Sequence, residues 1–211
     1  MIGIIYLTTV RLEKIVVETK EQILNNALDM FAKSGYNAVS IRDIAKTVNI
    51  KESSIYYHFR NKQDILDSLV HKYESHIREL TNMLQAAMSD TNSINSFSWD
   101  WLREYYFEQY LFDTFCNQMM RFMMIEQFHN ENMRILYEHY LFELPRNIQT
   151  GAFMMLSQFG IMNEQQAEEC GNDFFANMTT LTFKYLLNGE LTKAKKDAFC
   201  EEAFAYINGM F

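Results

Sequence analysis

The chain contains few of the residues that interrupt helices. Its 211 residues include one proline and seven glycines, and these two residue types most often break helices or form turns. With so few interruptions, the composition therefore predicts long helices.

Cysteine is scarce and scattered. Cys116, Cys170 and Cys200 lie far apart, with no CxxC spacing. An odd, dispersed set argues against a disulfide framework and against a zinc site, and it fits a reducing compartment. We therefore expect no metal and no cofactor.

Long apolar runs and a recognisable leader are also lacking. No stretch reaches the roughly 18 apolar residues that a membrane-spanning helix requires. The opening MIGIIYLTTVRLEKI has no basic segment before its short apolar run and no convincing cleavage site. We expect a soluble cytoplasmic protein with no membrane partner.

Motifs of common enzyme classes are missing as well. The sequence contains no GxSxG, HExxH, P-loop or dinucleotide-binding pattern. His129 and His139 are ten residues apart with carboxylates nearby, which is weak as a metal or haem site. We therefore expect that the protein is not an enzyme.

Charge is distributed unevenly along the chain. Residues 1–75 carry ten Lys and Arg against nine Asp and Glu, whereas residues 76–211 carry nine against eighteen. The N-terminal part therefore repels a polyanion much less than the remainder does.

Apolar spacing of three and four residues predicts helices along most of the chain. A Ser- and Asn-rich stretch at 89–98 reads as a linker, and Pro145 is expected to kink or divide its helix. Asn163 and Gln166 resemble a capping box. The expected helices cover 19–34, 41–48, 52–59, 62–89, 99–110, 112–128, 131–159, 164–188 and 192–208.

One segment near the N-terminus carries the densest signal. Residues 40–66 read SIRDIAKTVNIKESSIYYHFRNKQDIL. Ser40 is a good N-cap for the helix that follows, and Asn49 tolerates the left-handed conformation that a tight turn requires. Two short helices joined by about four residues are the layout of a helix-turn-helix.

The side chains of this segment suit DNA. The hydroxyl of Ser40 and the ammonium of Lys62 stand at helix starts, where a phosphate is favoured. Ser53 and Ser54 are small donors at the front of the third helix, where base edges come close. Tyr56, Tyr57 and His58 are consecutive, so they cannot all face the core.

Residues 19–66 resemble the DNA-binding domain of the tetracycline-repressor (TetR) family of bacterial transcription regulators. The resemblance rests on ILNNALDMFAKSGYNAVSIRDIAK followed by IYYHFRNKQDIL. It implies an all-helical homodimer that binds a palindromic operator on double-stranded DNA and responds to a small-molecule effector. The implied organisation is an N-terminal extension at 1–17, a helix-turn-helix domain at 18–66 and a ligand-binding and dimerisation domain at 67–211.

The resemblance also implies roles for single residues. Carried over by position, the phosphate contacts fall on Lys20, Ser40, Tyr56, Tyr57, His58 and Lys62, and the base or groove contacts on Arg42, Ser53 and Ser54. Lys51 and Glu52 depart from the family pattern. Glu52 would be repelled by phosphate, but it can accept a hydrogen bond from a cytosine amino group.

The second half is rich in aromatic residues and methionine. Between 97 and 128 these side chains are too numerous for one buried stripe, although each alone is more often core than pocket. Flexible Met and flat aromatic residues suit a hydrophobic or planar effector. We expect the cavity to draw on Trp101, Tyr105, Met119, Phe122, Met123 and Phe153.

By resemblance, the last two helices supply a four-helix dimer interface. Its predicted residues are Phe174, Phe175, Met178, Leu181, Thr182, Tyr185, Phe199, Ala203, Phe204 and Ile207. The alternative is a helical small-molecule-binding or adaptor protein whose N-terminal helices contact protein. Retention on duplex DNA that weakens steeply with salt distinguishes the two.

Overall fold

The computed structural model describes residues 2–89 and 103–210. Within these ranges every regular element is a helix and no strand occurs, so the predicted all-α class is confirmed. The chain forms two compact units, Met1–Glu74 and Ser75–Phe211. None of the described helices combines the length and apolar character needed to cross a membrane.

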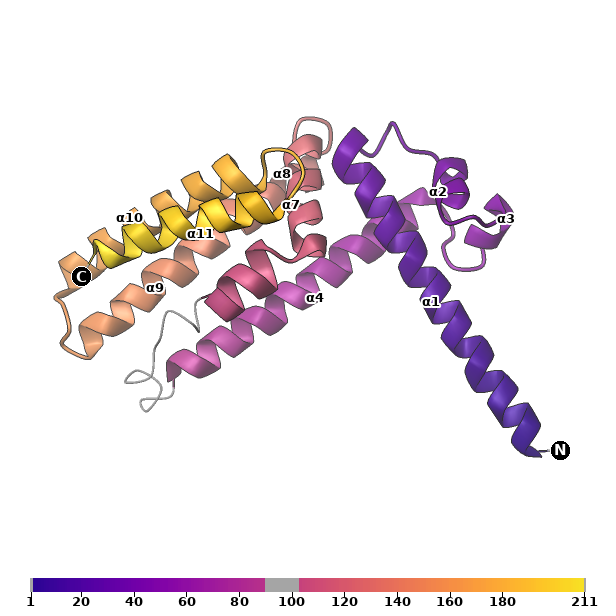
Figure 1. The fold of residues 1–211 in the computed structure, drawn as a ribbon, viewed down its shortest axis with the longest axis horizontal. Coiled ribbons are helices and arrows are strands. Elements are labelled where there is room, and N and C mark those ends of the chain that lie inside the picture. The colour runs from indigo at the N-terminus through magenta and orange to yellow at the C-terminus, as the bar shows by residue number, and fades with distance from the viewer. Residues whose placement is uncertain (1, 90–102, 211) are drawn as a thin grey trace. The chain divides into compact units, whose positions relative to one another are not determined.

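The first unit contains α1 (Ile2–Ser34), α2 (Ile41–Thr47) and α3 (Glu52–Ile55), and α4 (Lys62–Ser89) begins in it. The bounds of α4 match the sequence prediction. Two bounds were wrong, because α1 already begins at Ile2, whereas a start at 19 was expected, and α3 ends at Ile55, followed by a turn. Figure 1 shows the short α2 and α3 near the C-terminal end of the long α1.

Apolar spacing on α1 fixes the core of the first unit. Ile23, Ala27 and Phe31 recur every four residues, and all three are fully buried. They pack in a core with Ile44 of α2 and Ile55 of α3. Burial of each Ile or Phe side chain contributes roughly 1.5–3 kcal/mol, so this core holds α2 and α3, which are too short to be stable helices alone.

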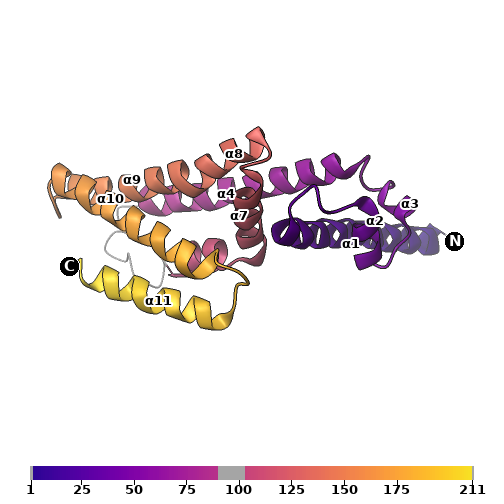
Figure 2. The same cartoon turned by 90° about the horizontal axis from the view of Figure 1, so that it is seen from above.

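The second unit is a bundle of helices in which Figures 1 and 2 both show α9 and α10 side by side. At this contact Gly171 of α10 lies against Thr150 of α9, where an added Cβ would come within 2.8 Å of the Thr150 Cα. The elements are η1 (Arg103–Leu111), α7 (Thr114–Glu126), α8 (Glu131–Glu138), η2 (His139–Glu143), α9 (Leu144–Gln158), α10 (Glu164–Leu181), η3 (Thr182–Leu186) and α11 (Lys193–Asn208).

Three of these elements, η1, η2 and η3, are π-helical. Pro145 lies at the first turn of α9, directly after η2. Proline has no N–H for the preceding helical turn and its ring clashes there, so a wider turn accommodates the chain. Pro145 thus follows a change from π- to α-helix within a segment that stays helical from Glu131 to Gln158.

Candidate nucleic-acid interface

The start of α2 is held by a reciprocal cap. The Ser40 hydroxyl accepts a hydrogen bond from the Asp43 N–H (3.2 Å), and the Asp43 carboxylate accepts from the Ser40 N–H (3.0 Å) and hydroxyl (2.5 Å). These bonds hold the pKa of Asp43 below its usual value. Ser40 is exposed, but its hydroxyl proton is already engaged by Asp43.

The turn between α2 and α3 has the predicted conformation. Asn49 adopts φ = 59°, the left-handed region that Asn tolerates better than most residues. The Ile50 N–H donates to the Ala45 carbonyl at 3.0 Å, and the Asn49 N–H donates to the Lys46 carbonyl at 3.1 Å. The helix-turn-helix layout read from the sequence is therefore present.

Lys62, predicted to contact phosphate, is bound inside the unit. Its ammonium donates to the carbonyl oxygens of Tyr36 (2.9 Å) and Val39 (2.8 Å), and it lies 4.0 Å from the centre of the Tyr36 ring. Lys62 is half-buried. The side chain therefore fastens the loop between α1 and α2 to the start of α4.

Several exposed cations of this unit have no carboxylate partner among the described side chains. Lys20, Arg42, Lys46 and Lys51 are exposed, and within the described ranges none lies within 4.0 Å of a carboxylate. Lys33 and Arg60, by contrast, pair with Asp29 and Asp64. Lys46 had no role in the sequence prediction, although its place at the end of α2, one turn from Arg42, could have indicated one.

The residues of α3 and the following turn present polar groups outward. Ser53 is exposed and Ser54 half-buried. Tyr57 is 91% exposed and Tyr56 is 52% exposed. Phe59 is buried in the core.

His58 is half-buried beside this surface. Burial, and then the nearby Lys20 ammonium, lower the pKa of His58. Its imidazole is therefore neutral at ordinary pH and can donate one hydrogen bond and accept one.

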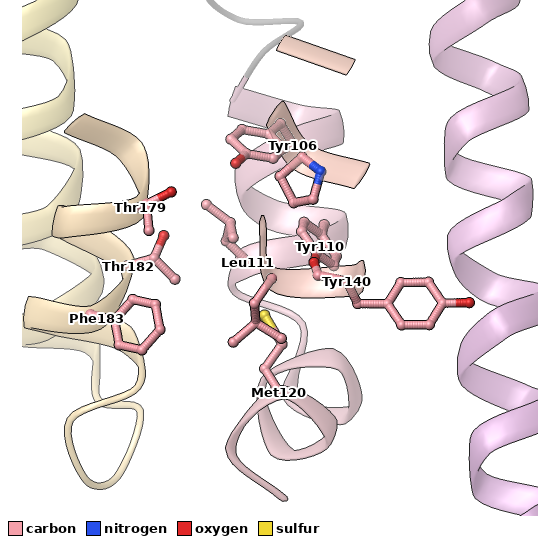
Figure 3. Close-up of a pocket in the computed structure, with 10 residues that line it drawn as sticks. Tyr106, Tyr110, Leu111, Met120, Tyr140, Thr179, Thr182 and Phe183 are labelled. Carbon is pink, nitrogen blue, oxygen red and sulfur yellow. The ribbon is translucent and has the colours of Figure 1, made fainter. Parts of the chain in front are cut away.

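The second unit contains a pocket, and its lining differs from the predicted cavity. It is small, with about 20 Å³ of space for a water-sized molecule. Seven of the ten lining residues belong to the π-helical segments. The lining consists of Tyr106, Tyr110, Leu111, Met120, Tyr140, Leu141, Pro145, Thr179, Thr182 and Phe183, and Figure 3 shows Thr179, Thr182 and Phe183 on one side with Leu111 and Met120 opposite.

None of the predicted cavity residues is in this lining. Met119, Phe122 and Met123 are fully buried in the core. Tyr105 and Phe153 are half-buried, and Phe153 packs against Phe174. Trp101 lies outside the described residues.

The residues predicted for the dimer interface divide into two groups. Phe175, Tyr185 and Phe204 are half-exposed. Phe199 packs edge-on against Phe107, with ring centres 5.1 Å apart. The residues buried within the unit itself are Phe174, Met178, Leu181, Thr182, Phe199, Ala203 and Ile207.

A capped α2, a left-handed turn and a short α3 with polar groups outward define a helix-turn-helix unit of the DNA-binding class. Residues 23–69 match the family described as bacterial regulatory proteins, tetR family. The first unit therefore carries a DNA-binding domain of the tetR family, and the predicted resemblance at 19–66 is confirmed.

Two curated relatives are similar to part of this chain. The biofilm operon icaADBC HTH-type negative transcriptional regulator IcaR of Staphylococcus aureus (strain Newman) is 34% identical over 94 residues, which are 44% of this chain and 46% of that protein. IcaR of Staphylococcus epidermidis is 46% identical over 46 residues, 22% of this chain and 25% of that protein. The chain thus matches less than half the length of these relatives.

Solved structures share the fold across both units. A transcriptional regulator of the TerR/AcrR family from Aquifex aeolicus VF5 has a TM-score of 0.63 at 17% identity, covering 92% of this chain and 99% of that one. A putative transcriptional regulator from Saccharomonospora viridis, in complex with choline, has a TM-score of 0.61 at 20% identity, covering 91% and 96%. At these identities the likeness shows the fold.

Proposed function

We propose that this regulator is a repressor that binds a palindromic operator as a homodimer and is released by a small effector. The observation that carries the proposal is the exposed helix-turn-helix of the first unit, with cations that have no carboxylate within 4.0 Å among the described residues. When such cations contact phosphates, the counterions condensed on the DNA are released. This release supplies much of the affinity for duplex DNA.

The exposed residues of the first unit divide into those that position the protein on the DNA backbone and those that read the bases. Lys20, Tyr57 and His58 contact phosphates, while Arg42, Ser53 and Ser54 of α2 and α3 approach base edges. Lys46 and Lys51 extend the cationic surface. Lys62 acts from within by holding the loop that precedes α2, and Ser40 by capping α2, so their phosphate contacts are secondary to these structural roles.

Repression is supported by the relatives, since both staphylococcal proteins are named as negative regulators. A homodimer suits a palindrome because its two-fold axis places two recognition helices about 34–36 Å, or a multiple, apart. Of the predicted interface, the half-exposed Phe175, Tyr185 and Phe204 have surface left for a partner.

The pocket of the second unit is the proposed effector site. Its aromatic lining from η1, η2 and η3 suits a hydrophobic or aromatic body, and π-helical turns often occur at functional sites. Gln149 provides a polar group nearby. Its Nε2 donates to the Tyr106 hydroxyl at 2.7 Å, while its buried Oε1 has no partner within the described residues.

Selection of bound duplexes from random DNA tests this function. We expect the selected sequences to share a palindrome, with binding that weakens steeply as salt rises. A protein that retains no duplex at low salt, but captures a protein partner through the first unit, would establish the adaptor alternative.

A further inference from the structure

Three side chains with metal-binding atoms meet in the second unit. His76 lies on α4, Asp113 directly precedes α7, and Cys116 lies in the first turn of α7. A ring nitrogen of His76, a carboxylate oxygen of Asp113 and the Sγ of Cys116 all lie within 4.8 Å of one another. The three residues come from two segments about 40 positions apart in sequence.

The His76 and Asp113 side chains each make a further contact. The His76 Nε2 lies 3.2 Å from the Gln109 carbonyl oxygen. Since a carbonyl only accepts, the ring proton of a neutral His76 lies on Nε2, which leaves the Nδ1 lone pair free to bind a cation. Outer contacts of this kind orient metal-binding histidines.

Asp113 also binds the backbone of Cys116. The Asp113 Oδ1 accepts the Cys116 N–H at 2.8 Å as the N-cap of α7. The second carboxylate oxygen is not used by this cap. Cys116 is fully buried, and His76 and Asp113 are half-buried, so the cluster is shielded from solvent on one side.

We propose that His76, Asp113 and Cys116 bind one thiophilic divalent cation of the zinc class. Nitrogen, oxygen and sulfur donors together suit Zn²⁺, whose bonds of about 2.0–2.3 Å place neighbouring ligand atoms roughly 3.3–3.8 Å apart. The observed spread of at most 4.8 Å closes to this range with small side-chain rotations. Water or a carbonyl oxygen completes the four-ligand shell.

The protonation of the Cys116 thiol distinguishes the metal-free cluster from the metal-bound one. Burial and the Asp113 carboxylate raise the pKa of the Cys116 thiol, which disfavours reaction of the free thiol with oxidants. A bound cation must displace this proton. The alternative is a buried cysteine that only packs beside a helix cap.

The position of the site gives it a regulatory consequence, which rests on the proposed function. A cation there ties α4 to the start of α7, and α4 begins at Lys62 within the DNA-binding unit. If the two DNA-affinity states of the protein differ in the placement of α4, the cation binds one state better and shifts DNA affinity.

Titration of the chelator-treated full chain with Zn²⁺ and Co²⁺ tests the site. We expect one equivalent per chain, with the thiolate-to-cobalt charge-transfer absorption in the Co²⁺ complex. His76→Gln and Cys116→Ser should each weaken the affinity at least about tenfold. Asp113→Asn keeps an N-cap acceptor and should weaken it as well.

Matched controls are available in the same unit. His139→Gln removes a histidine that lies 3.2 Å from the Glu143 carboxylate, and Cys200→Ser removes a half-buried cysteine. Both should bind the cation as wild type does, and circular dichroism should show every variant folded. Absence of stoichiometric binding, or equal binding by wild type and a folded His76→Gln, would overturn the site.

A DNA-binding measurement tests the metal site and the proposed function separately. With a selected duplex, Zn²⁺ should change the affinity of wild type and leave that of His76→Gln unchanged. An equal change in both would overturn the coupling. A chain that binds Zn²⁺ at this site but no duplex would refute the proposed function and keep the site.

Discussion

The ammonium of Lys62 lies over the Tyr36 ring, 4.0 Å from its centre, and donates a hydrogen bond of 2.9 Å to the Tyr36 carbonyl. A second bond reaches the Val39 carbonyl at 2.8 Å. One lysine at the start of α4 thus fixes the loop that leads into α2. The side chain that the sequence assigned to phosphate is part of the scaffold of the DNA-binding unit.

Loss of this lysine should lower stability. Lys62→Ala removes two hydrogen bonds from a charged donor, and we expect the free energy of unfolding to fall by about 1–3 kcal/mol. Urea denaturation monitored by circular dichroism measures it. Lys46→Ala, at an exposed site, should change stability by less than about 0.5 kcal/mol. Equal stability of the two variants would contradict the structural role of Lys62.

The exposed cations should set the salt dependence of DNA binding. Lys20→Ala is expected to lower the slope of log affinity against log salt concentration by about one. Lys33 on the same helix pairs with Asp29 at 2.8 Å, so Lys33→Ala should leave the slope nearly unchanged. Fluorescence anisotropy with a labelled duplex at several salt concentrations measures both, and a larger effect of Lys33 would refute the assignment.

Tyr57 should act on DNA and not on the fold. Its side chain is 91% exposed, so Tyr57→Phe should leave stability within about 0.5 kcal/mol of wild type. Loss of the hydroxyl should weaken binding of every duplex by a similar factor, since a phosphate contact carries no sequence information. Phe128, 80% exposed in the second unit, gives the control Phe128→Ala, for which unchanged DNA affinity is expected.

Filling the pocket should block the effector. Thr179 lines the pocket, and Thr179→Leu adds apolar volume to it, so affinity for an apolar fluorescent dye bound at one site per chain should fall. The neighbouring Thr180 is exposed, and Thr180→Leu should bind the dye as wild type does. Equal dye affinity in both variants would place the effector site elsewhere.

Stability should depend on pH through His58. Because the pKa of His58 is lowered from 6.5 in the folded chain, the unfolded chain takes up this proton first as pH falls. Stability should therefore be constant above about pH 7.5 and decline as pH falls through 6.5. Urea denaturation between pH 5 and 8 checks this, and His58→Gln should flatten the decline. A decline of the same size in the variant would assign it to another group.

Local signals in the sequence predicted much of the first unit. Ser40 as N-cap, Asn49 in the left-handed region and Lys62 as the first residue of α4 all depend on chemistry within a few residues. The same holds for the capping box of Asn163 and Gln166. Such features are encoded next to the place where they act, so the sequence is sufficient to find them.

Features that depend on distant contacts were not predicted. Lys62 meets carbonyl groups more than 20 residues away, which no spacing rule reveals. The pocket lies where η1, η2 and η3 converge, and a π-turn reflects packing more than residue type. The cluster of His76, Asp113 and Cys116 was not predicted either. Its single cysteine is joined by a histidine and an aspartate, and a pattern of paired cysteines does not reveal such a site.

Repeated aromatic spacing does not by itself distinguish a cavity from a core. Met119 and Phe122 suit a cavity by type, yet they lie in the core. Periodicity shows that a helix has an apolar face, but it does not tell whether that face meets the same chain, a ligand or a second subunit.

The most direct test is the affinity of the purified protein for its selected duplex, compared with a scrambled duplex at physiological salt. We predict a palindromic site that binds two chains and exceeds the scrambled duplex by at least about 10³-fold. Equal affinity for the two duplexes, or one chain bound per site, would contradict the account.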